Sequence, residues 1–296
     1  MNYKGSFCAL ITPFDKGEID EARYKKIIDF QIKNGTKGII PCGTTGESPT
    51  LSHNEHKRIV ELAVEFAGGK ILVMAGTGSN STREAVSLTK HAEESGANSA
   101  LVVVPYYNKP SQSGLKKHFL DIANSTNIPI FIYNIPSRSI VDMTIDTMAE
   151  LSKHPNIIGV KDASNDVSRP RRLINKIGNN NFIQLSGEDA TQLGFLAHGG
   201  DGVISVTANI FPNLICEIQE SWFNGNIARA IELDRMLLPF HDALFSESNP
   251  GPVKFAASRL DLCNYELRLP MTKISKINEV KVIKAMDDLN NLLLIR

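Results

Sequence analysis

Short apolar runs, rich in β-branched residues, recur along the chain, and each is followed by a turn and an amphipathic stretch. Within these runs the hydrophobic positions do not alternate with polar ones, which is typical of strands that are buried on both faces. The runs cover residues 7–14, 38–43, 71–76, 99–107, 129–136, 157–163, 182–187 and 202–208. The pattern therefore predicts about eight strands that alternate with helices.

The polar segments between the runs carry signals for the start of helices. Ser52-x-x-Glu55 and Ser81-x-x-Glu84 both fit a capping box, in which two side chains satisfy amide groups of the first helical turn. After the eighth run the pattern becomes helical only, over residues 212–223, 227–245 and 280–294. The last part of the chain is therefore predicted to be a set of helices.

Strands that alternate with helices over 296 residues favour an α/β fold, a TIM (β/α)8 barrel, over an open doubly wound sheet. The first strand is not followed by G-x-G-x-x-G, which weakens the dinucleotide-binding alternative. We expect residues 1–210 to form the barrel with the active site. Residues 211–296 are expected to form a C-terminal helical region, as an appendage and not as an independent domain.

Composition narrows the classes of partner. Lys+Arg and Asp+Glu both number 32, so the formal net charge is zero and gives no reason to expect nucleic acid or an anionic membrane as a partner. The four cysteines contain no C-x-x-C pair, which argues against a zinc site or a disulfide framework. No targeting segment and no run near the roughly 18 apolar residues of a membrane span are visible. We expect a cytoplasmic protein.

Lys161 is the most informative candidate for chemistry, because reacting groups of such barrels lie at the carboxyl ends of the strands. It follows the apolar residues Ile157-Ile158-Gly159-Val160, so its amine should point into a largely apolar barrel mouth. Burial of an unpaired ammonium is expensive, and this favours the neutral, nucleophilic amine. A lysine paired with Asp162 or another carboxylate at the rim of the barrel is the simpler structural alternative.

Hydroxyl groups at neighbouring strand ends strengthen the catalytic interpretation. Thr44, Tyr107 and Tyr133 could relay the protons that addition of an amine to a carbonyl requires. The turn Gly43-Thr44-Thr45-Gly46 could present backbone amides to an anion, or could be a plain turn; the ending of a Walker phosphate loop is absent. Arg138 could hold a substrate carboxylate, or could be a solvated surface arginine.

No metal site is predicted. His53 and His56 would share one face of a helix, but no third ligand with suitable spacing is present. The sequence also lacks a G-x-S-x-G nucleophile elbow.

Taken together, the segments GTTGES, VPYYNKPSQ, YNIPSRS, GVKDAS and GDGVISVTAN resemble the dihydrodipicolinate synthase family of the pyruvate-dependent class I aldolases. The resemblance runs in order from Gly5 to about Lys254. It implies an enzyme that condenses pyruvate with L-aspartate 4-semialdehyde through a lysine Schiff base, in lysine and diaminopimelate biosynthesis. It also implies a homotetramer, a dimer of dimers, without a metal or an organic cofactor.

The resemblance assigns roles to residues that match the family's motifs. Lys161 matches the Schiff-base lysine, and Tyr107 matches a tyrosine that reaches in from the neighbouring subunit of a dimer. The catalytic set is Lys161, Tyr133, Thr44 and Tyr107, and the substrate-binding set is Thr45, Arg138, Ile204 and Gly187. Arg138 is matched to the carboxylate of the semialdehyde, and Ile204 to a backbone carbonyl near the lysine.

A second set of matches concerns regulation. It resembles the site at which L-lysine inhibits many family members, and comprises Ser48, His53, His56, Asn80, Glu84 and Tyr106. The resemblance therefore implies feedback inhibition by L-lysine. The sequence departs from the family's usual pattern at Pro49, at Ser139-Ile140 and at Gly251, without loss of a reacting group.

Two alternatives remain open at the level of sequence. Another pyruvate-dependent aldolase, such as N-acetylneuraminate lyase or a keto-deoxy-sugar aldolase, would share Lys161, Tyr133 and the GTTGE turn. It would not need Arg138 together with a Tyr107 relay. A non-catalytic, lysine-binding regulatory barrel is a more remote alternative, because every predicted reacting group is retained.

Overall fold

The structure, a computed structural model, describes residues 1–178 and 181–294. Its main strands form a closed barrel in the order β1-β10-β9-β8-β7-β6-β5-β4. The strands are β1 (Gly5–Ala9), β4 (Gly38–Ile40), β5 (Leu72–Gly76), β6 (Ser99–Val103), β7 (Ile130–Asn134), β8 (Ile157–Asp162), β9 (Ile183–Ser186) and β10 (Gly202–Ser205). The prediction of an eight-stranded barrel with helices between its strands is confirmed.

Several predicted strands extend too far at their carboxyl ends. The run over residues 202–208 leaves the strand after Ser205 and continues as the short 3-10 helix η2 (Thr207–Asn209). The run over 99–107 ends as a strand at Val103, so Tyr106 and Tyr107 lie in the following loop. Residues beyond a strand can stay apolar because they are still buried, as Ala208 is. Hydrophobicity alone therefore does not mark where the ladder stops.

A short hairpin was not predicted. It consists of β2 (Phe14–Asp15) and β3 (Glu18–Ile19), which pair antiparallel. The predicted first run over 7–14 thus covers the last part of β1, a connecting segment and the start of this hairpin. Strands of two residues are too short to show a period in the sequence.

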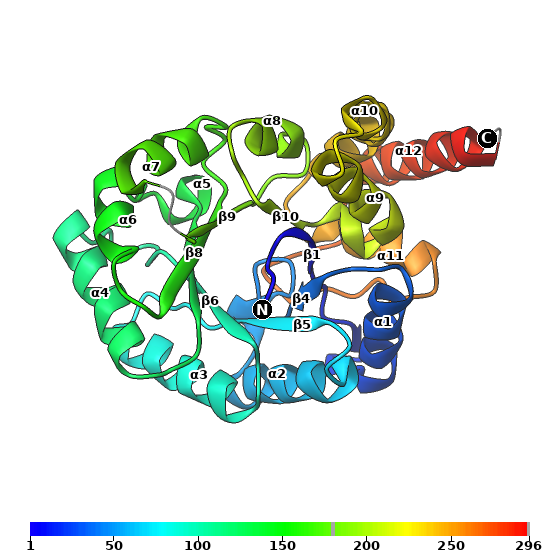
Figure 1. Ribbon diagram of the computed structural model, residues 1–296. Helices are drawn as coiled ribbons and strands as arrows, with labels where there is room; N and C mark the ends of the chain where they lie inside the picture. Colours follow the sequence, from blue (N-terminus) through cyan, green and yellow to red (C-terminus); the bar gives the residue numbers. More distant parts are fainter. Residues whose placement is uncertain (179–180, 295–296) are drawn as a thin grey trace. The chain divides into compact units, whose positions relative to one another are not determined.

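The chain groups into two units of dense contact, and the first contains Met1–Gly5 and Leu72–Ile204. It holds the strands from β5 to β10, with helices on their outer side (Figure 1). These helices are α3 (Thr82–Glu94), α4 (Gln112–Asn124), α5 (Pro136–Ser139), α6 (Ile145–Leu151), α7 (Arg169–Ile177) and α8 (Gln192–Ala197). Side chains such as Phe131, Ile132 and Val102 are fully buried, as expected for strands covered on both faces.

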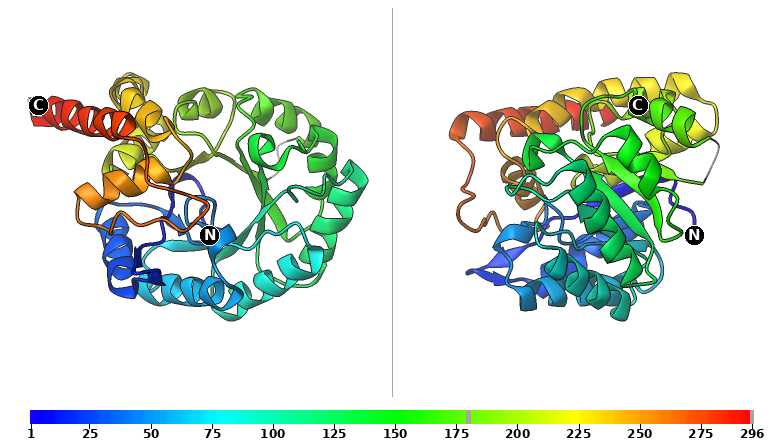
Figure 2. Two further views of the ribbon diagram at one scale, coloured as in Figure 1. Left: turned by 180° about the vertical axis from the view of Figure 1, so that it is seen from behind. Right: turned by 90° about the vertical axis from the view of Figure 1, so that its left-hand side faces the viewer.

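The second unit contains Ser6–Ile71 and the chain from Ser205 onward. Its helices are α1 (Glu21–Lys33), η1 (Ser48–Thr50), α2 (His53–Ala67), α9 (Pro212–Phe223), α10 (Ile227–Leu244), α11 (Gly251–Arg259) and α12 (Lys276–Leu294). Helix α12 packs along α10, as the red and yellow ribbons of Figure 2 show. Helices α9, α10 and α12 lie where helical periodicity predicted them, whereas the domain boundary near residue 210 stays a prediction. None of the described helices is long and apolar enough to cross a membrane.

The two predicted capping boxes have different outcomes. At α2 the box forms, with Ser52 accepting from the amide of Glu55 and Glu55 accepting from the amide of Ser52. At α3 Ser81 is the N-cap, but its side chain makes no capping hydrogen bond to the described residues. The Ser79 hydroxyl bridges the two residues of the expected box, because it accepts from the Ser81 amide and donates to the Glu84 carboxylate. The second box was therefore predicted at the right helix start with the wrong partners.

Candidate active site

Lys161 lies at the carboxyl end of β8 with its side chain buried, 6% exposed. Strands β7 and β8 pair in parallel with Tyr133 opposite Lys161. The Lys161 Nζ atom lies 4.1 Å from the centroid of the Tyr133 ring, within the range of a cation–π contact. The two residues that the sequence placed on adjacent strand ends are therefore in contact.

Gly187, just after β9, makes room for the lysine. A Cβ atom at this position would lie 3.1 Å from the Lys161 Cε atom and 2.7 Å from the Cβ atom of Ala163. The Gly187 amide donates to the carbonyl of Asp162 at 2.7 Å, which holds the turn close to the end of β8. A larger residue at 187 would displace the lysine side chain.

Asp162 is not the partner of Lys161. It is the next residue along β8, so its side chain projects to the opposite side of the strand. There its carboxylate accepts from Arg169 Nε at 2.8 Å and from the Ser164 amide at 3.0 Å. Pairing of Lys161 with Asp162 is therefore wrong, whereas another carboxyl group, that of Glu188, does interact electrostatically with the lysine.

Glu188 is a charged neighbour of Lys161 that was not predicted as a site residue. Burial raises the pKa of its carboxyl group, while the positive charges of Lys161 and Arg138 act in the opposite direction. The positive charges of Lys161 and Arg138 therefore both lower the pKa of the same carboxyl group, that of Glu188. The only signal in the sequence was its place after the seventh apolar run, which did not separate it from an ordinary loop glutamate.

Arg138 is carried by the short helix α5, which directly follows β7. Its side chain is exposed, and its amide donates to the Ile135 carbonyl at 3.0 Å. Ile140 follows this helix with φ +67°, and it is 62% exposed. A β-branched residue in the left-handed region is a conformational outlier that has to be held by its surroundings.

Three residues of the predicted lysine site lie together in the first unit. The Asn80 side chain donates to the Tyr106 carbonyl at 3.2 Å, and Asn108 donates to the Asn80 carbonyl at 2.8 Å. Burial raises the pKa of the Tyr106 hydroxyl, and the charge of Glu84 raises it further. Asn80, Glu84 and Tyr106 are therefore neighbours.

Tyr107, next to this cluster, has the opposite environment. It is 87% exposed, with φ +73°. Its ring therefore points away from the packed part of the first unit.

The GTTGES turn belongs to the second unit and is fixed by buried polar contacts. The Thr45 hydroxyl oxygen accepts from the Asn249 side chain at 2.9 Å. Glu47, at φ +56°, forms a 2.5 Å ion pair with Lys254, with both side chains buried (1% and 0% exposed). Burial lowers the pKa of the Lys254 ammonium, and Glu47 opposes this shift. Asn249 and Lys254 belong to the segment NPGPVK. Nothing in the sequence of this segment predicted that it contacts the GTTGES turn.

The remaining predicted residues have defined positions within their own units. Ser48 begins η1, and His53 and His56 lie in the first turn of α2, with His56 buried and His53 exposed. Thr44 is half-buried in the second unit, and Ile204 is buried in β10 of the first. Among the described residues there is no cluster of histidine, cysteine, aspartate and glutamate that could hold a metal ion.

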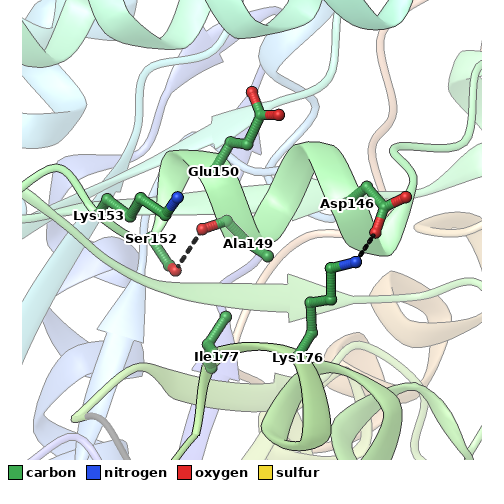
Figure 3. A pocket seen from close by; sticks show the side chains of 7 residues that line it. All are labelled: Asp146, Ala149, Glu150, Ser152, Lys153, Lys176 and Ile177. Atoms are coloured by element: carbon green, nitrogen blue, oxygen red, sulfur yellow. Dashed lines mark hydrogen bonds and ion pairs between the residues drawn. The ribbon is translucent and has the colours of Figure 1, made fainter.

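A pocket is lined by residues of α6 and α7 and of the turn after α6 (Figure 3). It is lined by Asp146, Ala149, Glu150, Ser152, Lys153, Lys176 and Ile177. Its charged side chains include an ion pair of 2.8 Å between Lys176 and Asp146. Both of these side chains are largely exposed, so the pocket has the character of a solvated groove.

Known proteins match this chain over almost its whole length, in sequence and in fold. Residues 2–289 match the Dihydrodipicolinate synthetase family. A 4-hydroxy-tetrahydrodipicolinate synthase from Rhodospirillum centenum is 55% identical over 269 residues, which are 91% of this chain and 92% of that relative. The solved structure of the 4-hydroxy-tetrahydrodipicolinate synthase from Methylacidiphilum fumariolicum matches with a TM-score of 0.97 and 42% identity, over 99% of this chain and 98% of that one. A solved dihydrodipicolinate synthase from Cyanidioschyzon merolae with lysine bound matches at a TM-score of 0.94 and 35% identity, over 98% and 99% of the two chains.

The closed barrel, with a buried lysine at a strand end, defines a (β/α)8-barrel enzyme. The chain belongs to the dihydrodipicolinate synthetase family. It is an enzyme of the dihydrodipicolinate synthase type, which confirms the resemblance found in its motifs.

The buried pair between Lys254 and Glu47 gives a prediction of stability. Replacement of Lys254 by Met keeps the volume but leaves the Glu47 carboxylate buried without its counterion. We expect the free energy of unfolding to fall by about 3–5 kcal/mol, as is usual when a buried ion pair loses one partner. Urea unfolding followed by circular dichroism measures this change.

The matched control is Lys284→Met, which removes an exposed helical pair with Asp288. Such pairs contribute only about 0.3–0.5 kcal/mol. A Lys254→Met variant as stable as this control would contradict the prediction.

Proposed function

We propose that the enzyme condenses pyruvate with L-aspartate 4-semialdehyde through a Schiff base on Lys161, in lysine and diaminopimelate biosynthesis. The observation that carries the proposal is the burial of Lys161 against the Tyr133 ring, with Gly187 making room for its side chain. This position lets the Lys161 side chain attack a carbonyl that is bound at the end of β8. The names of the relatives supply the class of product.

The reaction begins with addition of the Lys161 amine to the ketone carbon of pyruvate. Water leaves, an imine forms, and loss of a methyl proton converts it to an enamine. The enamine carbon then attacks the aldehyde carbon of the semialdehyde, forming a carbon–carbon bond and an alcohol. The amino group of the second substrate finally displaces Lys161 as the ring closes, which regenerates the free amine.

Hydroxyl groups move protons during these steps. Tyr133 is in contact with Lys161 and can exchange a proton with the carbonyl oxygen. We assign Thr44 and Tyr107 to the same relay, Thr45 and the carbonyl of Ile204 to the pyruvate site, and Arg138 to the carboxylate of the semialdehyde. Because Asn249 already donates to the Thr45 oxygen, the Thr45 hydroxyl proton is directed elsewhere and can be donated to a substrate carboxylate.

The Schiff base gives a direct test. Incubation with pyruvate and sodium borohydride should reduce the imine and leave a stable adduct on the peptide that contains Lys161. Lys161→Ala should lose both the adduct and the synthase activity, whereas Lys176→Ala, in an exposed ion pair, should keep both. Mass spectrometry of the digested protein locates the adduct. An unmodified Lys161 in an active wild-type enzyme would refute the covalent mechanism.

The assembly is proposed to be a homotetramer built from two dimers. The exposure of Tyr107 supports this. Its side chain is 87% exposed on a left-handed backbone, so it is accessible to a neighbouring subunit. We assign Tyr107 to the active site of the neighbouring subunit of a dimer. A dimer would then be the smallest unit with a complete proton relay.

Mixing of two inactive variants tests this assignment. Lys161→Ala and Tyr107→Phe are each expected to have little activity. In a mixed dimer one site combines a native lysine with a native Tyr107, so a fully exchanged equal mixture should recover about a quarter of wild-type activity. The assay follows the mixture over time after subunit exchange. If Tyr107 serves its own subunit, the mixture stays as inactive as its components.

L-lysine is proposed as a feedback inhibitor. Asn80, Glu84 and Tyr106 are neighbours, and they combine a carboxylate for an ammonium group with polar groups for a carboxylate. Ser48, His53 and His56 are assigned to the same effector site. The lysine-bound relative from Cyanidioschyzon merolae supports this choice of ligand.

The charge of Glu84 should decide the affinity for lysine. Glu84→Gln keeps the shape but loses a charge-assisted hydrogen bond, so the inhibition constant for L-lysine should rise about 10-fold or more. Initial rates over a series of lysine concentrations measure this constant. Glu94→Gln, an exposed position on the same helix, is the matched control. Equal inhibition constants in both variants would remove Glu84 from the effector site.

The state of the cysteines indicates the cellular compartment in which the enzyme acts. Cys8, Cys42, Cys216 and Cys263 are all free and buried thiols. This state suits a reducing compartment, and we infer that the enzyme acts in the cytoplasm.

A further inference from the structure

The side of β7 and β8 opposite to Lys161 and Tyr133 carries a buried polar network. Asn134 follows Tyr133, Asp162 follows Lys161, and the two are paired in register. Successive side chains of a strand point to opposite sides, so Asn134 and Asp162 face away from the reacting pair. Both are buried, and Asn134 Nδ2 lies 3.5 Å from Asp162 Oδ2.

Arg169 joins this network to the segment that follows Arg138. Its Nε atom donates to Asp162 at 2.8 Å, and a terminal nitrogen donates to the Met143 carbonyl at 2.6 Å. The other terminal nitrogen lies 3.2 Å from Asp142. The guanidinium thus holds the end of β8 and residues 142–143 at the same time.

Asn134 completes the connection from β7. Its side-chain amide donates to Asp142 at 2.8 Å, and its oxygen accepts from the Met143 amide at 3.0 Å. Residues 142–143 are therefore fixed from both strands, by Asn134 and by Arg169. Hydrogen bonds within a largely buried polar network fix one geometry strongly.

The fixed segment also explains how an unfavourable backbone persists nearby. Ile140 has φ +67°, and its side chain is largely exposed, so its own packing does not hold it there. The short stretch that carries Arg138 and Ile140 is anchored at one end by β7 and at the other by Asp142 and Met143. A backbone conformation outside the favoured regions persists only when the surrounding structure holds it in this way.

We propose that Arg169 is a positioning residue, which clamps residues 135–143 to the end of β8 and thereby fixes Arg138 relative to Lys161. The proposal rests on the proposed function, in which Lys161 binds pyruvate and Arg138 binds the carboxylate of the second substrate. Arg169 touches neither substrate. Its effect should therefore fall on the second substrate and leave formation of the pyruvate imine largely unchanged.

The test compares Arg169→Gln and Arg169→Lys with wild type. Arg169→Gln should raise KM for aspartate semialdehyde about 10-fold, because small displacements of a substrate-binding group have large kinetic effects. Its KM for pyruvate and its borohydride adduct on Lys161 should stay near wild-type values. Arg169→Lys should recover part of the loss, because one charged contact remains. Arg172→Gln, an exposed arginine of the same helix that contacts Ser168, is the matched control and should behave as wild type.

A second variant protects the test against misfolding. Asp142 is half-exposed, so Asp142→Asn weakens the outer contact of Arg169 and leaves the buried pair with Asp162 in place. It should show the same selective rise in KM for the semialdehyde. The inference is overturned if these variants leave that KM unchanged, or if they weaken the pyruvate adduct as much as the second-substrate step. Failure of wild type itself to form the adduct or the product would instead overturn the proposed function.

Discussion

The parallel pairing of β7 with β8 is the constraint on which the site depends. This register places Tyr133 beside Lys161 and Asn134 beside Asp162. Because side chains alternate across a strand, one register sets the reacting pair on one side and the polar support on the other. A slip by one residue on either strand would turn a reacting group away from the site and bring a supporting group into it. Chemistry and scaffold are therefore determined by the same set of backbone hydrogen bonds.

Charges in this protein are buried in two different ways. Lys254 and Arg169 are each paired with a carboxylate, and each pair connects segments far apart in the sequence or on different elements. Lys161 packs over an aromatic ring and next to a glycine, with the Glu188 carboxyl group as a charged neighbour. Buried ion pairs return little net stability, since desolvation offsets much of the attraction. We interpret the paired charges as devices that fix loop geometry, and the surroundings of Lys161 as those that hold its side chain in place for reaction.

Much of this arrangement could be predicted from the sequence because strong local signals coincide with the fold. Unalternating apolar runs indicated the strands, and strand ends indicated Lys161 and Tyr133. The ends of the strands were less certain, because residues such as Ala208 stay buried after the ladder has stopped. Ser81 marked the start of a helix, but its amide donates to the Ser79 hydroxyl and not to the Glu84 carboxylate, as the capping box would require.

The supporting residues could not be predicted, for a physical reason. Arg169 lies in the polar stretch NDVSRPRR, and only the folded chain distinguishes it from Arg171 and Arg172. Asn249 and Lys254 reach the GTTGES turn across some two hundred residues of sequence. Long-range polar contacts leave no periodic pattern, because each depends on one side chain and one partner.

Cys42 lies just before the GTTGES turn and is almost completely buried. Burial raises the pKa of its thiol, so very little thiolate exists while the surrounding segment stays closed. Alkylation of Cys42 can then proceed only during brief openings of this segment. The rate at which Cys42 is alkylated therefore reports how often the segment around the turn opens, without an added probe.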